Sequence, residues 1–91
     1  MINFVNRFIV EISFDNDEDM RIVEEHTFEN FQHMKHYLKY LGFDTKNLEE
    51  KIANTIDYKL NKDNYSEEYD ISLNKPLSRS YKLYAMITID I

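Results

Sequence analysis

Residues 2–14 read INFVNRFIVEISF and residues 81–91 read YKLYAMITIDI, and these two stretches decide the fold. In the first, six of the seven even positions are apolar, and in the second every odd position is apolar. Alternation with a period of two is the pattern of a strand that buries one face. Because these are the longest and most apolar alternating stretches of the chain, we expect two long strands that pair at the centre of one sheet.

Two weaker stretches predict two further strands. Residues 15–19 read DNDED, which ends the first alternation with turn-forming residues, and residues 20–27 carry the charges of an edge strand. Residues 65–73 alternate again, and residues 74–80, with the only proline of the chain, form a turn before the last strand. Each long strand is therefore expected to have a hairpin partner.

The middle of the chain changes to a helical period. Apolar residues spaced by three or four positions predict an amphipathic helix, and they are Phe28, Phe31, Met34, Leu38 and Leu41. Thr27 stands at the expected N-cap position. Gly42 follows the stripe at the expected C′ position, where a left-handed conformation costs a glycine nothing and Phe43 can add an apolar contact.

A second helix is predicted to begin within residues 44–47 and to end at residues 61–64. Asn47 and Glu50 have the spacing of a capping box, and the expected buried stripe is Leu48, Ile52, Ile56 and Leu60. The element order is then ββααββ. We expect one α+β domain over residues 1–91, a two-layer sandwich of a four-stranded antiparallel sheet with two helices on one face.

The composition argues against an enzyme and against a cofactor. The chain has no cysteine, which excludes a disulfide scaffold and a cysteine-ligated metal site. A single glycine cannot build a phosphate-cradling loop, and no serine stands in a nucleophile elbow. Adjacent glutamates point apart in a strand or a helix, so they are poor acid/base partners. We expect no catalytic residue and no cofactor.

The localisation expected from the sequence is cytoplasmic, or the host cytoplasm if the protein is viral. No basic segment precedes an apolar run at the N-terminus, which is where a secretory signal would stand. No apolar run approaches the roughly 18 residues that a membrane-spanning helix needs. We therefore expect no membrane partner.

Two patterns resemble metal sites, and neither is complete. Asp15, Asp17 and Asp19 match the first half of a calcium loop, but the sixth position is Met20 and the twelfth is His26, where glycine and glutamate are required. We interpret this stretch as an acidic turn.

Glu29, His33 and His36 are spaced so that one helical face can present a carboxylate and two imidazoles. No other segment offers an obvious fourth ligand. We therefore expect surface histidines and no metal site.

The charge of the chain is concentrated in one stretch. The net charge is −6, and residues 15–30 hold seven acidic residues against Arg21 alone, which accounts for all of it. We predict one acidic end that binds a basic protein surface and repels nucleic acid and anionic lipid. The predicted contact residues are Asp15, Asp17, Glu18, Asp19, Glu24 and Glu25. The alternative is that these acids only keep a small protein soluble.

Two other surfaces are candidates for contacts. Val5, Ile9, Tyr84 and Met86 are expected to point away from the helices, and their composition is typical of an interface. The alternative is that they are scattered apolar residues of an ordinary surface. The segment 75–82 is locally basic, and we interpret it as a solvated turn, because its three separate charges would bind phosphates only weakly.

Small size, acidity and a composition rich in Asn, Lys, Ile, Tyr and Phe resemble those of phage-encoded inhibitors such as anti-CRISPR proteins and DNA mimics. Carboxylates spaced along a strand can stand in for backbone phosphates. The leading hypothesis is a non-enzymatic inhibitor that occupies a basic surface of a nucleic-acid-handling protein. The alternatives are an immunity-like or antitoxin-like partner of a toxin, and a structural or assembly subunit that forms a homodimer through its sheet face.

Overall fold

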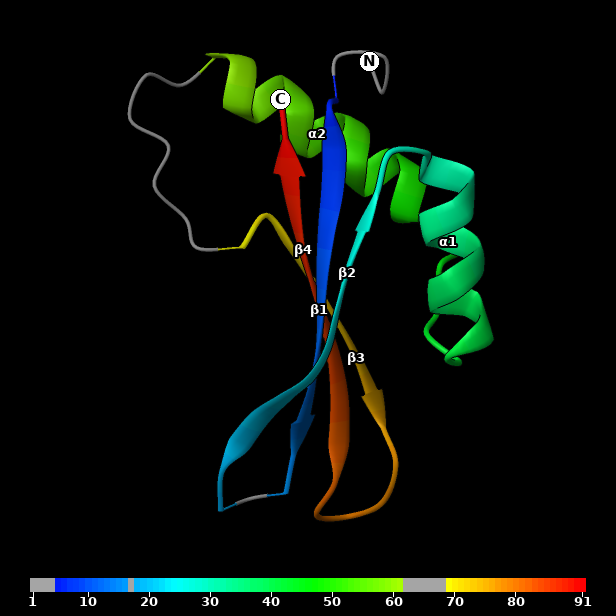
Figure 1. Cartoon of the computed structure of the whole chain (residues 1–91), viewed down its shortest axis with the longest axis vertical. Helices are drawn as coiled ribbons and strands as arrows, with labels where there is room; N and C mark the ends of the chain where they lie inside the picture. Colours follow the sequence, from blue (N-terminus) through cyan, green and yellow to red (C-terminus); the bar gives the residue numbers. More distant parts are fainter. Residues whose placement is uncertain (1–4, 17, 62–68) are drawn as a thin grey trace.

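The computed structural model describes residues 5–16, 18–61 and 69–91. It contains four strands and two helices in the predicted order, which confirms the α+β class (Figure 1). The elements are β1 (Arg7–Asp15), β2 (Met20–Phe28), α1 (Phe31–Tyr40), α2 (Leu48–Asn61), β3 (Ile71–Pro76) and β4 (Lys82–Asp90). Neither helix has the length and apolar character needed to cross a membrane.

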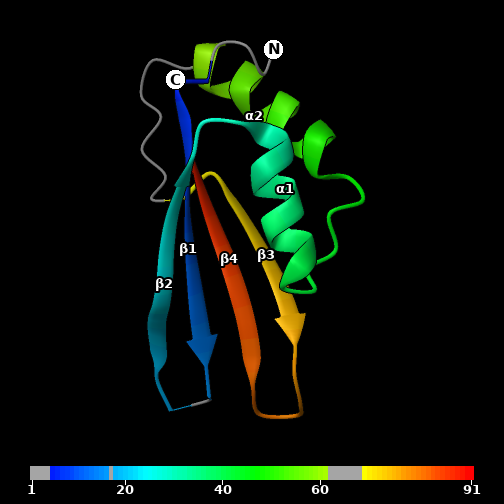
Figure 2. The ribbon, with the colours of Figure 1, turned by 45° about the vertical axis from the view of Figure 1, so that its right-hand side comes forward.

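The sheet has the strand order β2-β1-β4-β3, and every neighbouring pair is antiparallel. β1 and β4 therefore pair at the centre, as predicted, although β2 is as long as either of them, at nine residues. Their register aligns Phe8 with Ile89, Val10 with Ile87 and Ile12 with Ala85. In Figure 2 the hairpins β1–β2 and β3–β4 lie side by side, and both turns are at the same end of the sheet.

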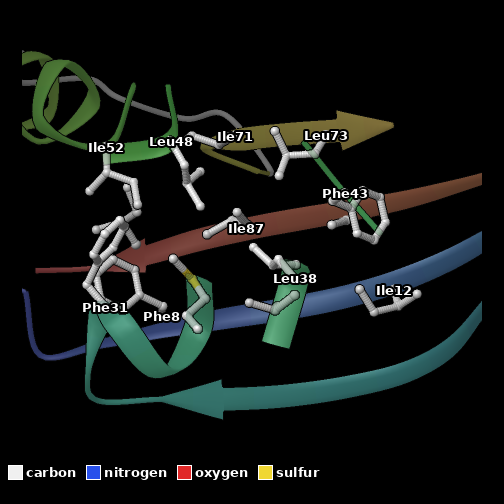
Figure 3. Packing of buried hydrophobic residues seen from close by; sticks show 14 of the residues in the cluster. Phe8, Ile12, Phe31, Leu38, Phe43, Leu48, Ile52, Ile71, Leu73 and Ile87 are labelled. Atoms are coloured by element: carbon white, nitrogen blue, oxygen red, sulfur yellow. The ribbon is translucent and has the colours of Figure 1, made fainter. Parts of the chain in front are cut away.

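The core lies between one face of the sheet and the two helices. The predicted alternation is confirmed, because the even residues of β1 from Phe8 to Ile12 and the odd residues of β4 from Ala85 to Ile89 are buried. The helices contribute their own stripes to the same cluster (Figure 3). The helical core residues are Phe31, Met34, Leu38, Leu48, Ile52 and Ile56.

The start of α1 differs from the prediction. Phe28 pairs with Phe8 as the last residue of β2, so Thr27 is not the N-cap and Phe28 is not helical. The N-cap is Asn30, whose side-chain oxygen accepts the backbone N–H of His33 at 3.1 Å. Pairing with β1 extends the strand to Phe28, and asparagine caps a helix at least as well as threonine.

The end of α1 agrees with the prediction. Gly42 has a φ of 93° and donates its N–H to the carbonyl of Lys39, and Phe43 donates to the carbonyl of Leu38 at 3.0 Å. These two bonds form a Schellman motif, and Phe43 and Leu38 are both buried. The chain reverses at Gly42 and returns alongside α1.

The last turn of α2 also differs from the prediction. Leu60 is 54% exposed, and Ile56 is the last buried residue of the helix. Lys59 reaches the sheet instead, donating from Nζ to Asp70 Oδ2 at 3.0 Å and to the carbonyl of Ile89 at 2.6 Å. The side chain of Asp70 is only 2% exposed and also accepts the N–H of Ile89. This buried ion pair fastens α2 to the end of β4.

The strand bounds shift at two places. The structure describes β3 as Ile71–Pro76, three residues beyond the predicted end, so the predicted turn over 74–80 begins too early. Pro76 is tolerated because β3 is an edge strand and the proline is its last residue. The predicted start of β1 at Ile2 and the predicted residues 65–68 of β3 lie outside the described residues. Tyr69 and Asp70 are described, and they precede the strand, which begins at Ile71.

Candidate protein-binding surface

The acidic residues of the β1–β2 hairpin divide into two groups. Asp15 ends β1, while Glu18 and Asp19 lie in the turn, and Asp17 lies outside the described residues. The side-chain oxygen of Asn16 accepts the N–H groups of Glu18 at 3.2 Å and Asp19 at 3.0 Å. This Asx-type turn holds the first group at the tip of the hairpin.

The second group is Glu24 and Glu25, which lie on β2. Glu24 faces α1. The hydroxyl of Tyr37 donates to Glu24 Oε2 at 2.5 Å, and His26 Nε2 lies 3.6 Å from the same oxygen. The ring of Tyr37 also contacts those of His26 and Phe28, with centroids 4.8 and 5.4 Å apart. Burial, with the hydrogen bond to Glu24 and its negative charge, raises the pKa of the Tyr37 hydroxyl above its ordinary range. Glu24 therefore contacts two side chains of the fold, although its own side chain is 52% exposed.

Tyr37 was not among the predicted contacts, although the sequence contains a signal for it. It lies three residues after Met34 and four before Leu41, so it borders the apolar stripe of α1. An aromatic residue at the edge of such a stripe is placed to contact the neighbouring strand.

Glu25 lies on the opposite face of the sheet from Glu24. It aligns with Glu11, whose carboxylate accepts the hydroxyl of Tyr69 at 2.7 Å. β2 thus carries its two acids at adjacent positions on opposite faces, and they do not extend the acidic turn along one side. Glu24 and Glu25 lie on the predicted hairpin, but apart from the carboxylates of the turn.

A β-bulge lies between these acids and the turn. Ile12 aligns with Glu24 and Ser13 aligns with Ile22, which leaves Val23 without a partner on β1. The extra residue changes which positions of β2 share a face. It explains why residues 20–27 alternate only weakly in the sequence.

Exposed apolar side chains of both hairpins lie at the turn end of the sheet, on both of its faces. Five of the nine large hydrophobic residues that are exposed in the described part of the chain lie there. We call them the distal patch, and they are Met20, Ile22, Val23, Leu77 and Tyr81. The ring of Tyr81 stacks on Phe14 at 5.5 Å, and its carbonyl accepts the N–H of Leu77 at 2.9 Å. The stacking joins the β3–β4 turn to β1, and the hydrogen bond closes the turn itself.

Basic residues from the β3–β4 turn lie at the same end as the acidic turn (Figure 2). Lys82 aligns with Asp15 across the strands β1 and β4. Arg21 pairs with Asp19 at 3.5 Å, and Arg79 is exposed. Among the described residues, this end therefore carries charges of both signs. The segment 75–82 folds back beside the acidic turn, so the acidic residues do not stand alone at this end.

The face of the sheet opposite the helices carries three of the four predicted interface residues. Ile9, Tyr84 and Met86 alternate with the core residues of β1 and β4, and each is partly buried. Val5 precedes β1 and packs against the hydrophobic core instead. The prediction is wrong for Val5, because the strand alternation does not extend to that residue.

Glu29, His33 and His36 do not lie on one helical face in the structure. The helix begins at Phe31, so Glu29 lies before it and does not share a helical face with the histidines. No group of three or more His, Asp or Glu side chains placed to hold a metal occurs within the described residues. The predicted calcium-like half-loop includes Asp17, which lies outside them.

Comparison with known proteins identifies no family and no relative of this chain. No family model matches this sequence, and neither the curated proteins nor the solved structures contain a significant match.

Proposed function

We propose that this chain is a non-enzymatic binding protein that docks onto a partner protein through the distal patch and the charged turns around it. The observation that carries the proposal is the gathering of five exposed apolar residues at one end of the molecule. Apolar surface surrounded by charged residues is the usual composition of a protein interface. The two helices lie away from this end, so a partner can approach it freely (Figure 1).

The acidic turn beside the distal patch is proposed to face a basic part of the partner's surface. Asp15, Glu18 and Asp19 come from one turn, whereas Arg79 and Lys82 come from the other. A partner that places cations against the first turn and an acid against the second would be held in one orientation. A nucleic-acid-handling protein, whose groove is lined with Lys and Arg, has such a surface.

The mode of binding that fits best is an inhibitor with an apolar anchor and a charged rim. A DNA-like row of carboxylates is less well supported, since Glu24 and Glu25 point to opposite faces. An immunity-like or antitoxin-like partner of a toxin would use the same surface. The identity of the captured partner distinguishes these classes.

The test is capture of the partner from the source cells with a matched pair of variants. Leu77 in the distal patch and Leu60 at the end of α2 are 48% and 54% exposed. Leu77→Ser is expected to lose the captured protein, and Leu60→Ser is expected to retain it. Equal capture by both variants would place the interface elsewhere on the molecule.

A second candidate function is an assembly subunit that dimerises through the open face of the sheet. Ile9, Tyr84 and Met86 lie on this face, which the helices do not cover. Sedimentation equilibrium tests this candidate, because Tyr84→Glu would convert a dimer into a monomer. A wild-type protein that is monomeric at high micromolar concentration removes the candidate.

A further inference from the structure

A hollow of about 350 Å³ lies where the chain returns from α1 to α2. It is lined by Lys35, Lys39, Phe43, Asp44, Thr45 and Lys46, and we call it the lysine hollow. Lys35 and Lys39 are four residues apart and so share one face of α1. Lys46 comes from the connection between the helices. None of these residues belongs to the distal patch.

The walls of the lysine hollow are fixed by the fold. The Schellman turn at Gly42 brings Phe43 into the core, where it is 4% exposed, and Thr45 is 6% exposed. Asp44 Oδ1 accepts the N–H of Lys46 at 3.0 Å, and the carbonyl of Thr45 accepts the N–H of Leu48 at 3.2 Å. The connection therefore holds one conformation before any ligand arrives, which reduces the entropy lost on binding.

Within residues 5–16, 18–61 and 69–91, no ion pair joins a carboxylate to a lysine of the hollow. The ion pairs of the described residues involve Arg7, Arg21, His26 and Lys59, and none involves Lys35, Lys39 or Lys46. Three ammonium groups and the single carboxylate of Asp44 leave a local charge of +2 in a chain whose net charge is −6. Like charges held around one hollow raise its positive potential and attract an anion.

We propose that the lysine hollow binds a small phosphate-bearing molecule. A phosphate monoester carries a charge of about −1.5 to −2 at neutral pH, which matches the local charge of the hollow. The volume of the hollow lies at the lower end of the range for small-molecule sites. Flexible lysines that converge from two segments can donate to several phosphate oxygens at once. The site is separate from the proposed partner-binding surface.

The experiment is a ¹H–¹⁵N NMR titration at constant ionic strength with two probes, inorganic phosphate and AMP. Saturable shifts are expected at the amides of residues 44–46 and at Lys39, with those of the distal patch unchanged. Lys39→Gln and Lys46→Gln are each expected to weaken binding roughly tenfold, because each removes a charge-assisted hydrogen bond. Tighter binding of AMP would identify an ester as the ligand, and equal binding would identify the bare anion.

Lys82→Gln provides the matched control, since it removes the same charge from the far end of β4. It is expected to leave the affinity for phosphate unchanged. If Lys82→Gln weakens binding as much as Lys39→Gln, or if shifts spread over the surface without saturating, phosphate responds only to the overall charge and the proposal is wrong. All three positions are solvent-exposed or partly so, and the dispersion of each spectrum shows whether the variant is folded.

Discussion

The two ends of β1 and β4 share the same apolar alternation, but they differ in how far their side chains are buried. Near the helices, Phe8 and Ile89 pair across β1 and β4 and are almost completely buried. Near the turns, Phe14 and Leu83 pair in the same register on the same face, yet both remain partly exposed. Apolar alternation thus predicts a strand, but it does not predict whether that strand is covered.

The lengths of the elements explain the difference. A strand of nine residues spans about 30 Å, because each residue advances about 3.3 Å. A helix of ten residues spans about 15 Å, because each residue advances 1.5 Å. α1 therefore covers about half the length of β1, and α2 lies across the end of the sheet that is away from the turns (Figure 2). The turn end of the hairpins extends beyond both helices.

The largest expected effect is the loss of stability caused by a substitution at the covered end of the sheet. Ile87→Ala removes buried methyl groups from the centre of the core, where Ile87 is 0% exposed. Such changes typically cost about 2 to 5 kcal/mol. Leu77→Ala, at the turn end, is expected to cost less than about 0.5 kcal/mol. Urea denaturation measures both, and similar costs at the two sites would contradict the division of the molecule into a covered and an uncovered end.

The next effect concerns the ion pair that fastens α2 to β4. Asp70→Ala leaves Lys59, whose side chain is 20% exposed, without its carboxylate and removes the acceptor of the Ile89 N–H. Removing one partner of a buried pair typically costs about 3 to 5 kcal/mol, and partial exposure of Lys59 places the expected cost at the lower end.

The exposed ion pair between Arg7 and Asp90 is the control for this prediction. Its side chains are 54% and 40% exposed, and Asp90→Ala is expected to cost less than about 1 kcal/mol. Thermal unfolding of both variants at two salt concentrations measures the difference. A loss of stability in Asp90→Ala as large as in Asp70→Ala would show that burial does not decide the strength of these pairs.

A smaller effect is expected where β2 meets α1. Tyr37→Phe removes the hydrogen bond to Glu24 and is expected to cost about 0.5 to 1.5 kcal/mol at neutral pH. The pKa of Tyr37 is raised in the folded state, chiefly by burial and then by Glu24. Its contribution to stability is therefore fully present below the ordinary tyrosine pKa of about 10 and is lost as the pH rises above it.

When the pH is raised from neutral to above about 10, the free energy of unfolding should therefore fall less in Tyr37→Phe than in the wild type. Tyr40→Phe is the control, since Tyr40 is 85% exposed on the same helix. Denaturation midpoints measured across this pH range provide the test. A pH profile of Tyr37→Phe that parallels the wild type would assign the alkaline loss to other groups.

Sequence periodicity predicted the features that depend on local pattern. The central strands, the core stripes and the left-handed Gly42 are examples, because each follows from the spacing or conformation of residues within one segment. Phe28 shows the limit. It continues the helical spacing of Phe31, and nothing local indicates that its backbone pairs with Phe8 in a strand.

The candidate surface was less predictable, because its parts come from separate segments. Met20 and Tyr81 belong to different hairpins, and they lie at the same end of the sheet because β1 pairs with β4. The same pairing brings the basic turn beside the acidic turn. The acidic stretch was visible in the composition, but the balance of charge at this end depends on the topology.

Substitutions in the acidic turn are expected to have a small effect on stability. Their main expected effect is on binding. Asp15→Asn, Glu18→Gln and Asp19→Asn combined remove three carboxylates from the tip of β1–β2, and Glu18 and Asp19 are exposed. Asn16 supplies the oxygen that closes the turn, and the ion pair of Asp19 with Arg21 is exposed, so the free energy of unfolding should fall by no more than about 1 kcal/mol.

The binding kinetics separate the role of this turn from that of the distal patch. Charges at the rim of an interface mainly speed encounter, so the triple variant should associate more slowly with the captured partner at low salt and dissociate at nearly the wild-type rate. Leu77→Ser should show the reverse, since apolar anchors mainly slow dissociation. Surface plasmon resonance at low and high salt measures both rates. If the triple variant associates as fast as the wild type at low salt, the acidic turn serves solubility, and the partner recognises the apolar residues alone.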